Sequence, residues 1–315
     1  MGTYQMMDRT AAMLVRIGAK GFRYLAYNRS KMPRFQAASD RVGIQVRSTH
    51  YYEPTYRSAD LPTEFGAERD LPGIDFAPER QLEFLGRCRF GTELSAIPWE
   101  HRDGVEFGFN NGAFGPGDAE MLYNMIRLLR PRRILEIGSG RSTQIARLAV
   151  AANLRDDPDY LCEHACIEPY EQPWLEQLGV TVLRDRVEKV GLAPFLALEA
   201  NDILFIDSSH IIRPCGDVLF ELQEIIPHVA AGAYVHVHDI FTPRDYPEKW
   251  VRHDRRLWNE QYLLESFLAF NGDFEIVSML NWLHHNHRAA LAAACPVLGA
   301  HPEEEPGSFW FRRKA

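Results

Sequence analysis

The chain has 315 residues, of which 46% are hydrophobic and 25% are charged, as in an ordinary globular protein. This composition excludes a disordered, collagen-like or coiled-coil chain, and no uncharged apolar stretch approaches the ~20 residues that span a bilayer. The five cysteines are scattered and contain no CxxC pair. An odd, scattered set of cysteines favours a reducing, cytoplasmic location over a disulfide-stabilised secreted protein.

The net charge of −8 is unevenly distributed along the chain. Residues 1–50 hold nine Lys and Arg against two Asp, so the rest of the chain is strongly acidic. An acidic body argues against nucleic acid as a partner, because phosphate contacts need a basic surface. Residues 1–49 are predicted to form a basic arm with a helix at about 6–28. The arm has the composition of a peripheral membrane segment, but docking against protein is the favoured interpretation.

Residues 50–117 are rich in proline, glycine and aromatic residues. This composition predicts loops and short helices, with one regular helix at 78–93. We interpret the segment as an extension that caps a substrate site, and its aromatic side chains as candidates for lining an acceptor pocket. The polar run of histidines at 284–287 is predicted to form a solvated turn.

From residue 118 to 315 short apolar runs alternate with helical patterns. The predicted strands are 133–137, 165–168, 180–184, 202–206 and 233–238, and the predicted helices are 118–129, 142–153, 173–178, 187–198 and 217–226. This alternation predicts an α/β fold with a doubly wound, mostly parallel sheet and helices on both faces. A helix at 259–270 and strands at 274–280 and 308–312 follow. Ligands of such sheets bind at the carboxyl ends of the strands.

The most specific motif is a hydrophobic strand that runs into a glycine-rich turn and then a helix, at 134–143. Glycine allows the backbone to approach a ligand closely, and the N–H groups at the helix start face that ligand. A nicotinamide dinucleotide fold needs G-x-G-x-x-G/A, but Thr143 stands at the last position. This departure disfavours a nicotinamide oxidoreductase.

Glu136, Gly138 and Gly140 resemble the first motif of the class I S-adenosylmethionine-dependent methyltransferases, an acidic residue followed by G-x-G at the end of the first strand. The resemblance implies a Rossmann-like fold and S-adenosyl-L-methionine as cofactor. It implies that the turn holds the methionine part, with Glu136 reaching its cationic groups, and that Glu168 binds both ribose hydroxyls. The cofactor-binding residues that it implies are Glu136, Gly138, Ser139, Gly140, Ser142, Glu168, Asp185, Arg186, Asp207 and Ser208, with Asp185 and Arg186 near the adenine.

The segments 110–119, 207–210, 238–241 and 245–247 resemble a group of bacterial small-molecule methyltransferases. Class I enzymes also end in an antiparallel hairpin, which suits the two closing strands. The resemblance implies methylation of a small acceptor, most simply a hydroxyl of a sugar-containing or aromatic metabolite, with N-methylation left open. A non-catalytic cofactor-binding protein is an alternative, but it would not need polar side chains after the fourth and fifth strands. The oligomeric state, including a homo-oligomer, is also left open.

Those polar side chains are the candidates for catalysis. Asp207 and His210 follow the fourth strand, and His238 and Asp239 end the fifth. His210 is the first choice as general base, because an imidazole accepts a proton near neutral pH. Asp239 is assigned to orient this histidine or hold the substrate, and His238 is the substitute base.

A divalent metal is the mechanistic alternative. Catechol O-methyltransferase-like enzymes hold such an ion with Asp after strand four and Asp-Asn after strand five, and Asp207 and Asp239 match the first two positions. Ile240 replaces the amide ligand, which argues against the metal. Strand alternation also predicts that His238 and Asp239 point to opposite faces unless the chain bends. A ligand role for His210 or His238 would favour a transition metal over magnesium.

Overall fold

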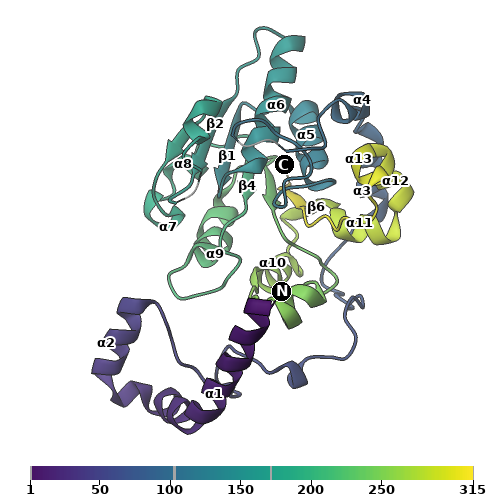
Figure 1. Ribbon diagram of the computed structural model, residues 1–315. Helices are drawn as coiled ribbons and strands as arrows, with labels where there is room; N and C mark the ends of the chain where they lie inside the picture. Colours follow the sequence, from purple (N-terminus) through teal and green to yellow (C-terminus); the bar gives the residue numbers. More distant parts are fainter. Residues whose placement is uncertain (1, 102–103, 171, 315) are drawn as a thin grey trace. The chain divides into compact units, whose positions relative to one another are not determined.

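The computed structural model describes residues 2–101, 104–170 and 172–314 (Figure 1). The chain forms two compact units. The smaller unit comprises Met1–Phe65 and Lys249–Leu257, and the larger unit comprises Gly66–Glu248 and Trp258–Ala315. Residues 50–117, which the sequence suggests as one extension, are divided between these units.

The smaller unit contains one long helix and several short ones. Its helical elements are α1 (Gly2–Asn28), η1 (Arg29–Lys31), α2 (Pro33–Val42), η2 (Ser58–Asp60) and η6 (Lys249–His253). The carboxylate of Glu53 pairs with the guanidinium groups of both Arg29 and Arg47. These ion pairs tie the segment after α2 to the end of α1.

The larger unit contains one seven-stranded sheet in the order β3-β2-β1-β4-β5-β7-β6. Its strands are β1 (Arg133–Ile137), β2 (Glu163–Ile167), β3 (Thr181–Leu183), β4 (Ile203–Ile206), β5 (Tyr234–Val237), β6 (Phe274–Met279) and β7 (Phe309–Arg313). The first five strands run parallel, and β7 lies antiparallel between β5 and β6. The predicted sheet, with its antiparallel closing strands, is confirmed.

Helices cover both faces of this sheet (Figure 1). Alternate residues of the strands belong to two hydrophobic cores, one on each face of the sheet. Ile134 and Phe205 pack on one face, and Leu135 and Leu204 pack on the other. The helical elements of the larger unit are α3 (Pro78–Arg87), α4 (Gly91–Ser95), α5 (Asp118–Leu129), α6 (Arg141–Asp156), η3 (Leu175–Leu178), α7 (Val187–Val190), α8 (Ala193–Leu196), α9 (Asp217–Phe220), η4 (Glu221–Ile225), η5 (Ile226–His228), α10 (Glu260–Leu268), α11 (Leu280–Asn286), α12 (Arg288–Ala294) and α13 (Pro296–Ala300).

Three local predictions from the sequence are wrong. The predicted helix 78–93 is two helices, because the chain becomes extended at Cys88. The predicted helix 187–198 is interrupted at Gly191, whose φ of +76° ends α7. The predicted solvated turn at 284–287 lies mostly in α11, where His284 is buried. Packing against the sheet makes this polar-looking segment helical.

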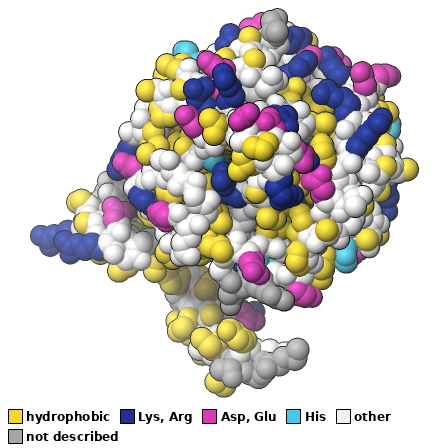
Figure 2. Space-filling model, turned by 90° about the horizontal axis from the view of Figure 1, so that it is seen from above, with side chains coloured by type: hydrophobic (Ala, Val, Ile, Leu, Met, Phe, Trp, Pro, Cys, Tyr) yellow, Lys and Arg dark blue, Asp and Glu magenta, His cyan; other side chains and the backbone are white. Residues whose placement is uncertain are grey.

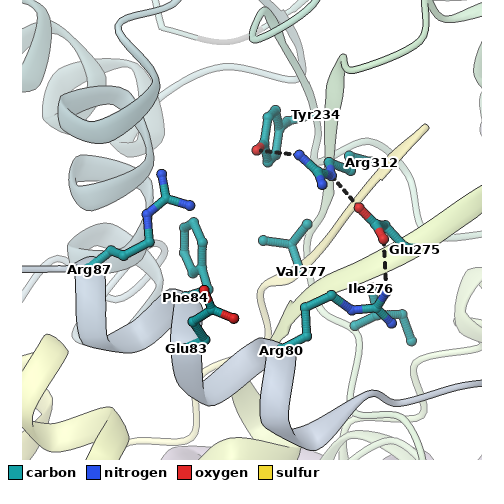
Figure 3. Close-up of a pocket in the computed structure, with 9 residues that line it drawn as sticks. All are labelled: Arg80, Glu83, Phe84, Arg87, Tyr234, Glu275, Ile276, Val277 and Arg312. Atoms are coloured by element: carbon teal, nitrogen blue, oxygen red, sulfur yellow. Dashed lines mark hydrogen bonds and ion pairs between the residues drawn. The ribbon is translucent and has the colours of Figure 1, made fainter. Parts of the chain in front are cut away.

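An ionic network joins α3 to the antiparallel end of the sheet (Figure 3). Glu275 of β6 accepts hydrogen bonds from Arg80 of α3 at 2.8 Å and from Arg312 of β7, and Arg312 also reaches the hydroxyl of Tyr234. These residues line a pocket of about 260 Å³. Because Tyr234 begins β5, the pocket lies at the opposite sheet edge from the carboxyl ends of the parallel strands.

Acidic and basic side chains are interspersed on the face seen in Figure 2, with no continuous basic patch on that face. Within residues 2–101, 104–170 and 172–314, no helix has both the length and the apolar character needed to cross a bilayer.

Candidate active site

The glycine-rich turn at the end of β1 is shaped by close backbone packing. Gly138 has a φ of +76°, and a Cβ at this position would lie 1.8 Å from the carbonyl oxygen of Asp207. The Gly138 N–H donates to the carbonyl of Ile167, and the Asp207 N–H donates to that of Ile137. Only glycine fits this position, since both the conformation and the contact exclude a side chain. The turn therefore sits directly against the end of β4.

Glu136 lies beneath this turn and is fully buried. Its carboxylate accepts a hydrogen bond from the Thr143 hydroxyl at 2.5 Å, and it lies 3.3 Å from Nε2 of His164. The Thr143 hydroxyl in turn accepts the N–H of Gly140 at 3.1 Å. Thr143, which departs from the dinucleotide pattern, thus links Glu136 to the glycine turn. The acidic residue supports the turn from below.

Glu168 follows β2 and reaches the same turn. Its two carboxylate oxygens accept the N–H of Ser139 at 3.2 Å and that of Tyr170 at 3.0 Å. The hydroxyl of Ser139 is buried and has no hydrogen-bond partner among the described residues. A buried polar atom without a partner is costly unless a ligand satisfies it. The turn and Glu168 therefore fit a polar cofactor.

The other residues implied for the cofactor lie in different environments. Ser142 is buried in the first turn of α6. Asp185 and Arg186 are exposed after β3, and Arg186 donates to the Tyr170 hydroxyl at 2.9 Å. The hydroxyl of Ser208 is hydrogen-bonded to Glu221 at 3.1 Å.

A cluster of two carboxylates and two imidazoles stands where β4 and β5 end. We call Asp207, His210, His238 and Asp239 the Asp–His cluster. Nε2 of His210 lies 3.3 Å from Asp207 and 3.6 Å from Asp239. Nδ1 of His238 lies 3.5 Å from Asp207 and 3.7 Å from Asp239. The structure thus brings together all four residues that the sequence proposes for catalysis or metal binding.

Strand alternation predicts that His238 and Asp239 point to opposite faces unless the chain bends after the strand, and the chain does bend there. The backbone bends at Asp239, which has a φ of +57°. A non-glycine residue in the left-handed region is uncommon, and it marks a position that its surroundings hold in place. The bend brings the carboxylate of Asp239 to the side of His238.

Two acidic residues that the sequence does not assign to the site hold the histidines. Oε2 of Glu260, in α10, lies 3.0 Å from Nδ1 of His210. Oδ2 of Asp118, at the start of α5, lies 3.4 Å from Nε2 of His238, and Asp118 also accepts the N–H groups of Gly307 and Ser308. Each ring therefore turns one nitrogen to a supporting carboxylate and the other into the Asp–His cluster.

The charges in the cluster stabilise one another. Burial alone would lower the pKa of His210, but its hydrogen bonds to Asp207 and Glu260 outweigh burial and raise that pKa to about 10. Burial would raise the pKa of Asp207, but His238 and His210 hold that pKa well below its ordinary value. Burial raises the pKa of Asp239.

The donor atoms also fit a divalent cation. Ligand atoms of Asp207, His238 and Asp239 all lie within 4.8 Å of one another. Donors that share one ion at ~2.1 Å are about 3 to 3.6 Å apart, and Nδ1 of His238 approaches this separation from both carboxylates, at 3.5 Å from Asp207 and 3.7 Å from Asp239. His238 has the second feature of a metal-ligating histidine, because its other nitrogen faces the carboxylate of Asp118. Ile240, at the position of the expected amide ligand, is buried in the core, and His238 offers a donor instead.

A further group of potential ligand atoms consists of Glu136, His164 and Cys166, all buried. Cys166 and His164 are alternate residues of β2, and they face Glu136 across the β1–β2 pair. Burial raises the pKa of the Cys166 thiol well above its ordinary value. These contacts support the glycine turn.

Comparison with known proteins identifies the domain. The family model of a methyltransferase domain matches residues 135–240, which include the glycine turn and the Asp–His cluster. An uncharacterized protein of Archaeoglobus fulgidus is 30% identical over 184 residues, which cover 54% of this chain and 81% of that protein. The chain belongs to the class I S-adenosylmethionine-dependent methyltransferases.

Two solved structures resemble this methyltransferase. One is the O-methyltransferase TomG from Streptomyces achromogenes, involved in tomaymycin synthesis, in complex with SAM, with 16% identity and a TM-score of 0.38. The other is an O-methyltransferase from Bacillus cereus in complex with SAH, with 13% identity and a TM-score of 0.37. Each match covers 74% of this chain and 90% of the other chain.

Membership of this methyltransferase family confirms the enzyme class and the cofactor predicted from the sequence, S-adenosyl-L-methionine. Family membership argues against the two alternatives from other classes, a nicotinamide oxidoreductase and a non-catalytic cofactor-binding protein.

Proposed function

We propose that this methyltransferase transfers the methyl group of S-adenosylmethionine to a hydroxyl oxygen of a small sugar-containing or aromatic molecule. The observation that carries the proposal is the position of the Asp–His cluster. The backbone carbonyl oxygen of Asp207, a residue of this cluster, packs against Gly138 of the glycine turn. A hydroxyl held by the cluster would therefore lie beside the cofactor. Such positioning is what an in-line displacement requires.

The residues around the glycine turn bind and orient the methyl donor. Glu168 accepts hydrogen bonds from the ribose hydroxyls, and the Ser139 hydroxyl takes the partner that it lacks within the described residues. Glu136 acts one layer below, because its carboxylate is directed to Thr143 and His164. Its role in this proposal is to fix the turn, while its negative charge favours the cationic methionine end.

Asp207, His238 and Asp239 would hold a divalent cation. An imidazole in the donor set favours a transition metal over Mg²⁺. When bound, the cation supplies positive charge that favours loss of the acceptor hydroxyl proton.

With the charge of Asp207 offset by a cation, the pKa of His210 would fall from about 10, and the neutral ring would take up that proton at Nε2, which faces Asp207 and Asp239. Glu260 holds the opposite nitrogen of the ring and stabilises the imidazolium that forms, as the buried carboxylate does in other catalytic triads. His238 stands at the other side of the cluster with Asp118 behind it.

The test is transfer of radiolabelled methyl from S-adenosylmethionine to a panel of catechols, phenols and sugar alcohols, with Mn²⁺, with Mg²⁺ and with EDTA. The account expects transfer to oxygen that EDTA removes and Mn²⁺ restores. Asp207→Asn should abolish transfer, whereas the matched exposed variant Asp159→Asn should retain it. Transfer that withstands EDTA would contradict the cation, and an N-methylated product would contradict the hydroxyl acceptor.

His210→Ala separates the two roles that this residue can have. If His210 is the base, the variant should lose turnover and keep its affinity for Mn²⁺. A loss of Mn²⁺ affinity would show that His210 is a metal ligand instead.

A further inference from the structure

Helix α1 carries a large apolar surface that the described residues leave exposed. Tyr4, Met7, Leu14, Ile17 and Phe22 have relative exposures of 85%, 61%, 62%, 70% and 47%. Exposed apolar residues are normal singly, but a contiguous set along one helix marks an interaction surface. The function proposed above uses none of these residues.

The cations of α1 lie on one stripe. Arg9, Arg16 and Arg23 are spaced by seven residues, which is close to two turns of an α-helix. Lys20 falls on the same side, since it is four residues beyond Arg16. Met7 and Leu14 lie about 200° away from Arg9 and Arg16 around the helix axis, on the opposite side. The basic stripe thus lies opposite Met7 and Leu14, while the exposed side chain of Met13 lies beside the stripe, three residues before Arg16.

The basic stripe has no counter-charge in the part of the chain that the structure describes. No ion pair involves Arg9, Arg16, Lys20 or Arg23 there, and Asp8 is the only acidic residue of α1. A binding partner of this helix must therefore offer both anionic groups and apolar surface. A lipid surface with acidic headgroups offers both, at adjacent depths.

We propose that α1 lies in the surface of an anionic membrane, with its apolar face at the headgroup–acyl boundary and its basic stripe against acidic headgroups. The four cations agree with this placement, because they would oppose insertion across the bilayer. Aromatic residues suit the interface, and α1 has Tyr4, Phe22 and Tyr24. This inference does not depend on the proposed methyl acceptor.

The experiment is flotation of the full chain with vesicles of pure phosphatidylcholine and of phosphatidylcholine mixed with phosphatidylglycerol. The wild type should float only with the anionic vesicles, and added salt should weaken the association. The triple variant Arg9→Gln, Arg16→Gln, Arg23→Gln should lower the partition coefficient by roughly two orders of magnitude. The double variant Met7→Glu, Leu14→Glu should lose the association.

A control triple variant, Arg89→Gln, Arg132→Gln, Arg155→Gln, removes three exposed arginines of the larger unit. It should keep wild-type flotation. S-adenosylhomocysteine binding, measured for every variant, identifies any that fails to fold. The proposal is overturned if the wild type ignores anionic vesicles, or if the control loses flotation as the α1 triple variant does. It is also overturned if the wild type sediments as a dimer that Met7→Glu, Leu14→Glu dissociates, because α1 would then pack against a second copy of the chain.

Discussion

Nδ1 of His210 lies 3.0 Å from Oε2 of Glu260, although 50 residues separate them in the chain. Glu260 is buried at the start of α10 and fixes which ring nitrogen faces the Asp–His cluster. We predict that Glu260→Gln lowers kcat by about 10- to 100-fold, the usual effect of removing such a supporting carboxylate. KM for S-adenosylmethionine should change little, because Glu260 has no contact with the glycine turn.

Initial rates check this prediction, with Glu265→Gln as the control. Glu265 belongs to the same helix but binds Arg69 and Thr242. That variant should lose stability while the folded protein keeps its turnover. Equal effects of the two variants on kcat would show that Glu260 supports only the fold.

Gly138 is predicted to be irreplaceable. Gly138→Ala would place a methyl group against the Asp207 carbonyl, so it should abolish binding of S-adenosylhomocysteine and destabilise the fold. Gly179→Ala is the matched control, because Gly179 has a similar φ of +70° but open space around it. The control should cost about 1–2 kcal/mol of unfolding free energy and keep cofactor binding. Denaturant titration and calorimetry measure both quantities, and similar losses in the two variants would refute the close-contact explanation.

Glu168 is predicted to bind the ribose. Glu168→Ala should weaken S-adenosylhomocysteine binding by about 1–3 kcal/mol, because it removes a paired acceptor from a buried site. Glu163→Ala, in the same strand β2, removes a carboxylate that is 81% exposed and should leave affinity unchanged. Unchanged affinity of Glu168→Ala would mean that another residue binds the ribose.

Glu275 is predicted to contribute stability alone. Its partners Arg80 and Arg312 are 41% and 42% exposed, so Glu275→Gln should lower the unfolding free energy by only about 1 kcal/mol. The methylation rate of the folded protein should not change, since this network lies at the opposite edge of the sheet from the Asp–His cluster. A changed KM for the acceptor would contradict this assignment.

The sequence predicts the features that depend on short-range patterns. Apolar runs mark β1 to β5, and the G-x-G turn marks the cofactor site. The sequence also predicts that Asp207 and Asp239 lie close together, because the carboxyl ends of neighbouring parallel strands meet at one edge of the sheet. Two single breaks in helical patterns, at Cys88 and Gly191, were not predicted, because one residue of unfavourable conformation outweighs the periodicity around it.

Features that depend on tertiary contacts could not be predicted. Glu260 and Asp118 have ordinary helix-start patterns, and only the folded chain brings them to His210 and His238. The sequence does not mark the bend at Asp239, because alternation favours the opposite face and a positive φ is uncommon for any residue other than glycine. The buried histidine of α11 was hidden by polar neighbours, and packing determines its environment.

The most direct test of the account is calorimetric titration of the purified full chain with S-adenosylhomocysteine, with NAD as the control ligand. The account predicts a dissociation constant in the micromolar range for S-adenosylhomocysteine and no heat of binding for NAD. A correctly folded sample that does not bind S-adenosylhomocysteine would contradict the assignment of the glycine turn and Glu168 to the methyl donor.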